Sequence, residues 1–352
     1  MFAPQRVEPP LIAVRDGVVL GVGTDAWPYG RTRRLRGTVT PALVDLQVNG
    51  GAGVDLQHEG PDLARLHAWL RQGGILTYAP TLISASVPAM LALAARLTGE
   101  SGGVRALSPH FEGPFISVHR LGAHQAAPVA GCGPADVIAL GPHAGMVTLA
   151  PERAGGLEAI RALTRAGVRV SLGHSAATFE EAEAGFDAGA VMATHLFNAM
   201  EQLHHRRPGL VGAVLAGAHS PWAGLIADGD HVHPEVVRMA SRLLGERMVV
   251  VSDAVAAALD GTGASRLARP SGTVLAGSLT RLDRALANLI AWGVDPAAAV
   301  TAVTASPAAA ARISDRGRLE PGRASLVAVF DETWRVVGSG PLDVIAGQDA
   351  GV

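Results

Sequence analysis

Residues 167–200, GVRVSLGHSAATFEEAEAGFDAGAVMATHLFNAM, decide the fold of the chain. An apolar run at 168–172 is followed by a helical pattern at 178–188, which ends before Gly189, and then by a second apolar run at 191–195. Glycine is preferred just beyond the last turn of a helix, and short apolar runs bounded by turn residues are typical of buried strands. The order strand, helix, strand predicts one unit of a parallel sheet.

The same alternation extends outward over most of the chain. We predict strands at 42–46, 75–80, 104–111, 146–150, 168–172, 191–195, 223–227 and 248–252. Helical patterns lie at 61–72, 87–97, 156–166, 178–188, 234–244, 278–291 and 296–311. Eight buried strands that alternate with amphipathic helices predict an α/β fold, and more narrowly a closed (β/α)8 TIM barrel.

The two ends of the chain have a different character. Apolar runs at 11–14 and 18–22 flank Arg15-Asp16-Gly17, and an Asp-Gly pair favours a tight hairpin. Strand-like runs return at 325–330 and 334–337. We therefore predict that residues 1–40 and 325–352 join in one small β domain, a β-sandwich, and that residues 41–324 form the barrel.

The composition excludes several classes of protein. Hydrophobic residues make up 48% of the 352 residues, which is enough for a large core. A formal net charge of -2 with only 17% charged residues provides no basic surface for nucleic acid or a membrane. No apolar run approaches the roughly 20 residues of a membrane-spanning helix, and residues 1–10 lack the pattern of a signal peptide. Cys132 is the single cysteine, so we expect no internal disulfide and a cytoplasmic location.

All 29 basic residues are arginines. The absence of lysine excludes a Schiff-base lysine, a phosphate-loop lysine and a carbamylated lysine that bridges two metal ions. Several hydrolase and lyase mechanisms are excluded with them.

Ionisable residues follow the predicted strands repeatedly. Glu112 ends the third strand, His174 and His195 lie at the ends of the fifth and sixth, and Asp253 follows the eighth. One such residue alone would more often be a structural histidine or a helix cap. Barrel strands end at a common face, and buried charge is costly unless it is paired or bound to a metal, so the recurrence predicts one shared site.

Glu112, His174 and His195 form a set typical of catalytic zinc. A carboxylate and two imidazoles leave one coordination position open for water. Such a metal polarises a carbonyl group and lowers the pKa of water toward ~7. Asp253 then has a natural role as the base that accepts a proton from water and returns it to a leaving amine.

These motifs, in this order, resemble the N-acetylglucosamine-6-phosphate deacetylases of the amidohydrolase superfamily. The resemblance runs from about residue 11 to 345. The matching stretches are PALVDLQVNG (41–50), HFEGPF (110–115), LGAHQ (121–125), LAPE (149–152), GHSAAT (173–178), ATHLFNAM (193–200), RRPGLVG (206–212), IADGDHV (226–232), VSDA (251–254) and LAGS (275–278). Each piece alone is weak, but the combination is specific.

The resemblance implies a role for each matching position. Glu112, His174 and His195 correspond to the metal ligands, Asp253 to the catalytic acid and base, and His124 to the histidine that polarises the acetyl carbonyl. The positions that hold the sugar phosphate correspond to Asn198, Ala199, Arg206 and His231. A planar guanidinium also suits a phosphate dianion; without the resemblance, a solvated surface pair of Arg206 and Arg207 is the alternative.

The implied reaction is hydrolytic deacetylation of N-acetyl-D-glucosamine 6-phosphate to glucosamine 6-phosphate and acetate. The implied cofactor is one divalent metal ion, Zn²⁺ or else Fe²⁺, Mn²⁺ or Co²⁺. The implied assembly is a cytoplasmic homodimer whose neighbouring subunit could complete the phosphate site.

One departure from the superfamily pattern concerns the first strand. Many amidohydrolases carry His-x-His there and hold a second metal ion, whereas this chain has Gln47 and Asn49. Neutral amides are poor ligands for transition metals compared with imidazole. We therefore expect a single metal ion, with Asp45 ordering the motif by hydrogen bonds.

Two other classes of function stay open at this point. One is a different metal-dependent amidohydrolase, such as a deaminase or a cyclic-amide hydrolase. The other is a non-catalytic, amidohydrolase-like binding protein, in which Gln47 and Asn49 would reflect lost catalysis. Within the resemblance, N-acetylgalactosamine 6-phosphate is a further possible substrate.

Overall fold

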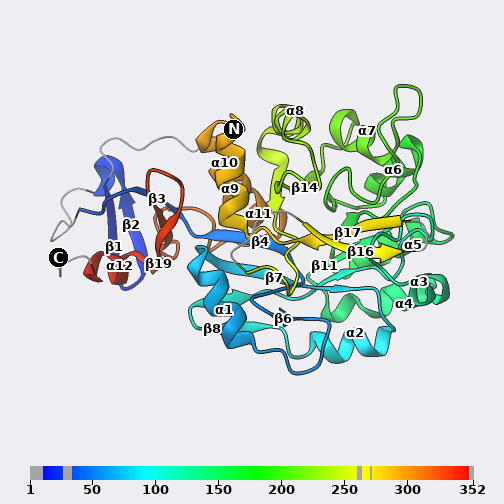
Figure 1. Ribbon diagram of the computed structural model, residues 1–352, viewed down its shortest axis with the longest axis horizontal. Coiled ribbons are helices and arrows are strands. Elements are labelled where there is room, and N and C mark those ends of the chain that lie inside the picture. Colours follow the sequence, from blue (N-terminus) through cyan, green and yellow to red (C-terminus); the bar gives the residue numbers. More distant parts are fainter. Residues whose placement is uncertain (1–10, 27–33, 260–263, 270–271, 349–352) are drawn as a thin grey trace.

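A parallel β-sheet runs through the main body of the molecule, and two small antiparallel sheets built from the ends of the chain lie beside it at one end (Figure 1). The computed structural model describes residues 11–26, 34–259, 264–269 and 272–348. Residues 1–10, on which the signal-peptide expectation rests, lie outside this part of the chain. The predicted α/β class is confirmed by the parallel sheet and the helices that surround it.

Neighbouring strands of the central sheet pair in parallel in the order β15-β14-β13-β12-β11-β10-β7, and β4 pairs with the other edge of β7. Each of these strands overlaps a predicted one. The bounds are β4 (Leu43–Val48), β7 (Ile75–Ile83), β10 (His110–Glu112), β11 (Met146–Leu149), β12 (Arg169–Leu172), β13 (Met192–Ala193), β14 (Trp222–Ile226) and β15 (Met248–Val251).

The predicted strand at 104–111 is wrong in one respect, because it is two strands. β9 (Val104–Ala106) pairs with the start of β7 and with β8 (Gly99–Ser101), whereas β10 pairs with the end of β7. Pro109 lies in the gap between them. A proline has no N–H group to donate to a ladder, so continuous pairing stops there.

The segment that follows β15 returns to β4. Val48 and Ala254 form a parallel bridge. The Asp253 N–H donates to the Gln47 carbonyl at 2.9 Å, and the Asn49 N–H donates to the Ala254 carbonyl at 2.8 Å. β4 is therefore flanked by β7 on one edge and by this segment on the other.

The helices cover the sheet between its strands. Those at predicted positions are α1 (Leu63–Gln72), α2 (Val87–Ala94), α5 (Gly156–Arg165), α6 (Phe179–Asp187), α8 (Pro234–Leu244), α9 (Leu282–Ala291), α10 (Pro296–Val303) and α11 (Ala305–Ala310). The pattern at 296–311 predicts one helix where the structure has α10 and α11. Pro307 explains the break, because it cannot donate to the Val303 carbonyl and its ring would clash with that group.

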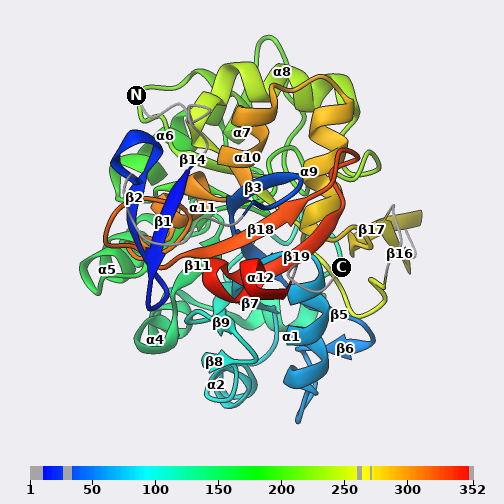
Figure 2. The same ribbon diagram turned by 90° about the vertical axis from the view of Figure 1, so that its left-hand side faces the viewer.

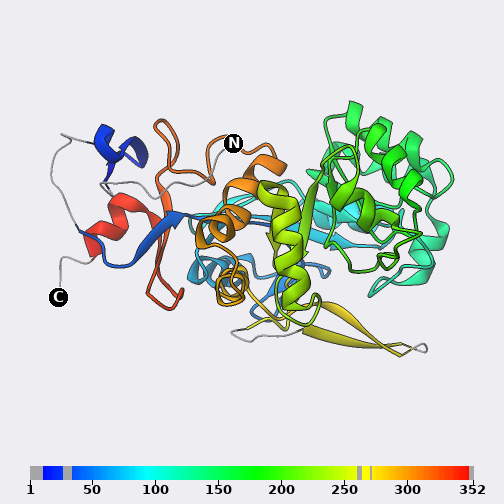
Figure 3. The ribbon, with the colours of Figure 1, turned by 90° about the horizontal axis from the view of Figure 1, so that it is seen from above.

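Several elements have no counterpart in the prediction. They are α3 (Ala126–Gly131), α4 (Pro134–Ala139), α7 (Gly209–Ala216), α12 (Leu342–Gln348), the short strands β5 (Gly50–Gly51) and β6 (Val54–Asp55), and the 3₁₀ turns η1 (Gly23–Ala26), η2 (Gly141–His143) and η3 (Gly245–Arg247). An antiparallel hairpin of β16 (Ala264–Arg269) and β17 (Gly272–Ser278) was also missed. It extends away from the body of the molecule (yellow in Figure 3) and delays the start of α9 to Leu282.

The two ends of the chain meet beside the central sheet. β1 (Ile12–Arg15) and β2 (Val18–Val22) form the predicted hairpin. β18 (Leu326–Phe330) pairs with β3 (Thr38–Pro41) on one edge and with β19 (Val336–Pro341) on the other (Figure 2). Buried Val327, Val329 and Leu342 form a separate small core with side chains from both ends.

The main core lies between the sheet and its helices, where leucine, valine and alanine side chains are fully buried. Among the described residues, no helix combines the length and the hydropathy needed to cross a membrane.

Asp45 connects the first strand of the central sheet, β4, to the residue that follows the last strand, β15. Its burial leads us to expect that the stability of the fold depends on pH. Its Oδ1 accepts from the Gln47 and Ser252 N–H groups at 3.2 Å each. These bonds confirm its expected ordering role. Burial raises the pKa of Asp45 from 3.8 to about 7. Between these values the folded chain holds a proton that the unfolded chain has lost, so this carboxyl stabilises the fold at low pH and loses that contribution as pH rises toward 7.

Asp45→Asn keeps an oxygen for both N–H groups and removes the titration. Its stability relative to the unsubstituted chain should increase between pH 4 and 7 by a few kcal/mol, since one pKa unit corresponds to about 1.4 kcal/mol. Urea unfolding at a series of pH values measures this difference. The same change at exposed Asp343 is the control. A stability difference for Asp45→Asn that is constant with pH would contradict the expectation.

Candidate functional site

The ionisable residues singled out in the sequence converge at the carboxyl ends of the parallel strands. Glu112 ends β10, His174 and His195 follow β12 and β13, and Asp253 follows β15; all are buried. His174, His195 and Asp253 have φ angles of 48°, 29° and 49°. Non-glycine residues rarely adopt this left-handed region, and such strain collects at functional sites. The backbone thus turns sharply where these three side chains enter the site.

Three atoms that could donate an electron pair to a metal ion face one another in this cluster. Glu112 Oε1 lies 3.0 Å from His174 Nε2 and 2.7 Å from His195 Nε2, and the two imidazole nitrogens are 3.2 Å apart. Ligands at 2.0–2.1 Å in a tetrahedral zinc site are about 3.3 Å from one another. The spacing of the three atoms is therefore close to that of a metal-ligand set.

The protonation of His174 suits a metal ligand. Its Nδ1 lies 2.8 Å from the Arg120 carbonyl oxygen, which can only accept a hydrogen bond. The neutral ring therefore carries its proton on Nδ1 and presents a lone pair at Nε2. Because that lone pair faces a carboxylate oxygen and another imidazole nitrogen, only a cation or a proton between them stabilises the arrangement.

His124 shows the opposite arrangement. The backbone N–H of Ser84 donates to His124 Nδ1 at 3.2 Å, and the Ser84 hydroxyl lies 2.6 Å from the same nitrogen. The neutral ring therefore carries its proton on Nε2, which lies 4.0 Å from Glu112 Oε2.

Two sets of three residues could hold a metal ion by distance alone. Glu112, His124 and His174 have donor atoms within 4.8 Å of one another, whereas Glu112, His174 and His195 lie closer together. We favour the second set, because the Ser84 bond makes His124 Nε2 a donor N–H group rather than a lone pair.

The electrostatics of the cluster reflect the same geometry. Burial alone would raise the pKa of Glu112, but His174 and His195, when their imidazoles are protonated at Nε2, hold it well below its usual value. Burial likewise opposes the charged form of His195, yet the Glu112 carboxylate raises the pKa of that imidazole. The site thus attracts positive charge to the space between these side chains.

Asp253 lies beside the cluster and is held by two amides. Its Oδ1 accepts from Gln47 Nε2 at 3.0 Å and from Asn49 Nδ2 at 2.7 Å. Gln47 Nε2 also lies 3.3 Å from Glu112 Oε2. The side-chain amides of Gln47 and Asn49 therefore orient the carboxylates of the site.

Burial, together with the charge of Glu112, raises the pKa of Asp253 from 3.8 to about 6. A carboxyl with a pKa near neutrality can both accept and release a proton during a reaction at pH 7. This is the property expected of a general acid and base.

The remaining predicted residues lie on loops around the same strand ends. Asn198 Nδ2 donates to the backbone carbonyls of His195 and Leu196 at 3.2 and 3.3 Å, and Ala199 has a φ of 51°. His231 Nδ1 lies 2.7 Å from Asp228 Oδ2, which fixes its ring. Arg206 is exposed, and its guanidinium makes no hydrogen bond or ion pair with the described residues.

Some contributors to the site were not predicted from the sequence. Nothing in the sequence marks Ser84 as the partner of His124, because it lies 40 residues away. Glu152 belongs to the LAPE stretch, but the sequence does not indicate what its side chain does. Its carboxylate accepts hydrogen bonds from the Ser175 hydroxyl and the Ala176 N–H. These partners become recognisable only when the loops are folded together.

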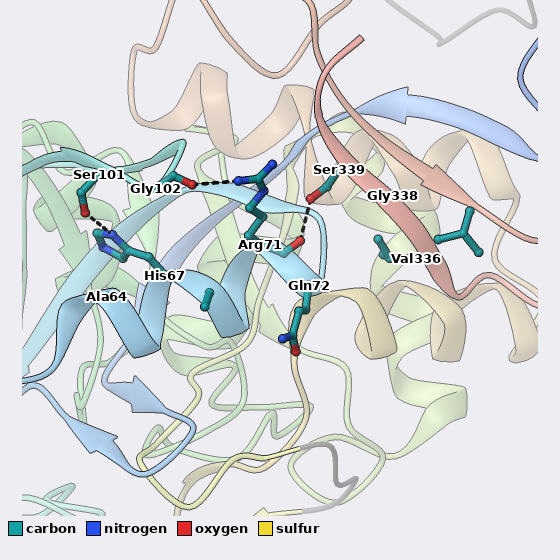
Figure 4. Close-up of a pocket in the computed structure, with 11 residues that line it drawn as sticks. Ala64, His67, Arg71, Gln72, Ser101, Gly102, Val336, Gly338 and Ser339 are labelled. Atoms are coloured by element: carbon teal, nitrogen blue, oxygen red, sulfur yellow. Dashed lines mark hydrogen bonds between the residues drawn. The ribbon is translucent and has the colours of Figure 1, made fainter. Parts of the chain in front are cut away.

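A cavity of about 690 Å³ lies elsewhere, between α1, the β8–β9 turn and β19 (Figure 4). Arg71 donates to the Gly102 carbonyl there, and His67 is bonded to Ser101. Several of its polar groups bond to one another, and the described residues that line it include no facing set of ligand atoms like that of Glu112, His174 and His195. We therefore place the functional site at the strand ends.

No protein-family model matches the chain. It is similar to the N-acetylgalactosamine-6-phosphate deacetylase of Escherichia coli O157:H7, with 36% identity over 347 residues that cover 92% of this chain and 91% of that protein. The N-acetylglucosamine-6-phosphate deacetylase of Rattus norvegicus is 35% identical over 85% of this chain and 80% of its own length.

A solved structure of a deacetylase also matches the chain. An N-acetyl-D-glucosamine-6-phosphate deacetylase mutant from Mycobacterium smegmatis, in complex with N-acetyl-D-glucosamine-6-phosphate, is 28% identical. The match has a TM-score of 0.82 and covers 93% of this chain and 91% of that one. The resemblance found in the sequence to this deacetylase family is thereby confirmed, and the chain belongs to the N-acetylglucosamine-6-phosphate deacetylase family.

Proposed function

We propose that the protein hydrolyses the acetamide of N-acetyl-D-glucosamine 6-phosphate to D-glucosamine 6-phosphate and acetate, in amino-sugar metabolism. The observation that carries the proposal is the set of three facing donor atoms beside an aspartate held by two amides. Family membership favours this reaction over a deaminase, a cyclic-amide hydrolase or a non-catalytic binding protein.

Glu112, His174 and His195 would hold one divalent metal ion. The lone pair that Arg120 leaves on His174 Nε2 and the short distances among the donors support this fit. When bound, the ion supplies a Lewis acid that polarises the amide carbonyl and makes water a better nucleophile. Two nitrogen donors and one oxygen donor suit Zn²⁺, and Fe²⁺, Mn²⁺ and Co²⁺ are compatible with the same set.

Asp253 transfers a proton from the attacking water to the amide nitrogen. With Oδ1 fixed by Gln47 and Asn49, Oδ2 accepts a proton from the attacking water. The same oxygen then delivers that proton to the amide nitrogen as the C–N bond breaks. The water thus contributes its oxygen to acetate, and glucosamine 6-phosphate leaves with a free amine.

His124 acts as a hydrogen-bond donor in the proposed reaction. Its Nε2 proton, fixed by the Ser84 bond to Nδ1, is directed toward the carbonyl oxygen of the acetyl group. A positioned N–H group of this kind stabilises the negative charge that develops on that oxygen, typically by about 3 kcal/mol.

Arg206, Asn198, Ala199 and His231 would bind the sugar phosphate. The exposed and unpaired guanidinium of Arg206 is available for a phosphate dianion. Asn198 keeps its side-chain oxygen for a ligand, because its nitrogen already bonds to the backbone. The relative from Escherichia coli is named for the galactosamine compound, so N-acetylgalactosamine 6-phosphate is the second substrate that the assay should include.

We further infer that the central sheet closes as a (β/α)8 barrel. The parallel bridge between Val48 and Ala254 supports closure, because it joins the first strand to the segment after the last. Residues 1–40 and 325–352 would form the small β domain and 41–324 the barrel; residues 1–10, 27–33 and 349–352 lie outside the described chain. A homodimer and a cytoplasmic location stay predictions.

The direct assay is release of acetate from N-acetylglucosamine 6-phosphate. Activity should disappear with a chelator and return with Zn²⁺. Asp253→Asn should lower kcat by a factor of about 10³ or more, because one residue performs both proton transfers. Its metal content should equal that of the unsubstituted protein. Full activity in Asp253→Asn, or no activity of the metal-loaded protein on either sugar phosphate, would contradict the proposed function.

Metal analysis separates the two possible ligand sets. His195→Asn should lose the ion during dialysis, because it removes a ligand. His124→Asn should retain one ion per chain and lose most of kcat. Elemental mass spectrometry of the dialysed proteins measures both. Loss of the ion from His124→Asn with retention in His195→Asn would reverse the assignment.

Arg206→Ala should raise KM for the phosphorylated sugar at least tenfold, which corresponds to about 1.4 kcal/mol of binding. Activity on unphosphorylated N-acetylglucosamine should not change. Arg207→Ala, at the adjacent exposed arginine, is the matched control. Equal effects of the two substitutions on KM would show that Arg206 has no specific contact with phosphate.

A further inference from the structure

We propose that the turn Glu152-Arg153, which follows β11 and contributes no metal ligand, positions the active site from two sides. Glu152 holds the backbone after His174. Arg153 closes the base of the loop 113–132, which carries His124 and the carbonyl that orients His174. The inference rests on the metal-ligand roles proposed above.

Glu152 binds the residues that directly follow His174. Its Oε2 accepts from the Ser175 hydroxyl at 2.7 Å, and its Oε1 accepts from the Ala176 N–H at 2.7 Å. The backbone of His174 is in the left-handed region, with φ 48°. A strained residue persists only where its surroundings fix it, and these two charge-assisted bonds are such a restraint.

The side chain of Arg153 leaves the Glu152-Arg153 turn in another direction and reaches the loop 113–132. Its Nη1 donates to the carbonyls of Ile116 and Val129 at 3.1 Å each and is 3.4 Å from that of Pro114. Its Nη2 donates to the Cys132 carbonyl at 2.7 Å. The guanidinium carbon also lies 4.2 Å from the centre of the Phe115 ring.

These carbonyls lie on both sides of His124 in the sequence. Pro114 and Ile116 precede it, and Val129 and Cys132 follow it. One planar cation therefore ties together the beginning and the end of the loop. A guanidinium has five N–H donors in a fixed plane, so it can serve several carbonyls at once in a way that an ammonium group cannot.

The loop that Arg153 closes contacts His174 at several points. The Arg120 carbonyl accepts from His174 Nδ1 at 2.8 Å, and the Ser117 N–H donates to the His174 carbonyl at 2.8 Å. A Cβ atom at Gly122 would lie only 3.2 Å from His174 Cε1. Displacement of the loop would therefore shift the ring that presents Nε2, as well as His124.

The turn thus connects two segments that are far apart in sequence and that meet at one histidine. Partners that orient metal ligands commonly contribute 10–100-fold to metal affinity or activity. Glu152 and Arg153 should act through His174 and His124 and have no contact with the substrate, so they are positioning residues.

The test uses Glu152→Ala and Arg153→Met in the full chain, with Glu152→Gln and Arg153→Lys as conservative variants. Glu158→Ala and Arg161→Met change the same charges at exposed positions of α5 and are the controls. We would measure Zn²⁺ affinity of the metal-free proteins by competition with a chromophoric chelator. The thermal midpoint, and kcat and KM at saturating Zn²⁺, would be measured for the same proteins.

Glu152→Ala and Arg153→Met should each bind Zn²⁺ about 10–100-fold more weakly, with KM nearly unchanged. Saturating Zn²⁺ should restore kcat in Glu152→Ala but not in Arg153→Met, because only the latter releases the loop of His124. Glu152→Gln should stay close to the unsubstituted protein, since the amide keeps one acceptor. Arg153→Lys should show a smaller loss than Arg153→Met; it also carries the test if Arg153→Met fails to fold.

Zinc affinities of Glu152→Ala and of the foldable Arg153 variants within about twofold of the unsubstituted protein, a difference below 0.5 kcal/mol, would overturn the proposal. Equal losses in the controls would also overturn it, because the effect would then be one of surface charge or general stability. Zinc affinity is measured without substrate. A protein that binds Zn²⁺ tightly yet releases no acetate would contradict the proposed function and leave the positioning result unaffected.

Discussion

The site depends on the mutual approach of three electron-pair donors, Glu112 Oε1, His174 Nε2 and His195 Nε2, within 2.7–3.2 Å of one another. In a buried setting this arrangement is unfavourable unless a proton or a cation lies among the three atoms, because lone pairs repel and a carboxylate is costly to desolvate. The fold holds the three atoms together because each side chain comes from a different strand end. The backbone at both histidines is strained in this arrangement. A cation among the three atoms would remove the repulsion, so the group could bind a metal ion.

The surrounding polar groups determine what each side chain can do. Arg120 gives His174 a lone pair at Nε2, and Ser84 gives His124 a proton at the same position. Two chemically identical rings therefore present opposite groups at Nε2, a lone pair on His174 and an N–H group on His124. Gln47 and Asn49 hold the carboxylate of Asp253.

Much of this could be predicted from the sequence, and the exceptions have physical causes. The strands and the convergence of Glu112, His174 and His195 follow from local patterns and from one rule about parallel sheets. Pro109 marks the strand break in the sequence, but the apolar pattern on both sides of it favoured one continuous strand. The partners Ser84 and Arg153 could not be predicted, since their contacts join loops and depend on side-chain direction rather than on periodicity. Proton positions on the histidines, which decide between ligand and donor, follow only from those contacts.

The most direct measurement of the central claim is X-ray diffraction from zinc-loaded crystals at wavelengths on both sides of the zinc absorption edge. The account predicts one anomalous peak per chain, at about 2.0–2.2 Å from Glu112 Oε1, His174 Nε2 and His195 Nε2, with His124 outside the coordination shell. A peak bound to His124 in place of His195, a second fully occupied ion at Gln47 and Asn49, or no peak at these residues would contradict it.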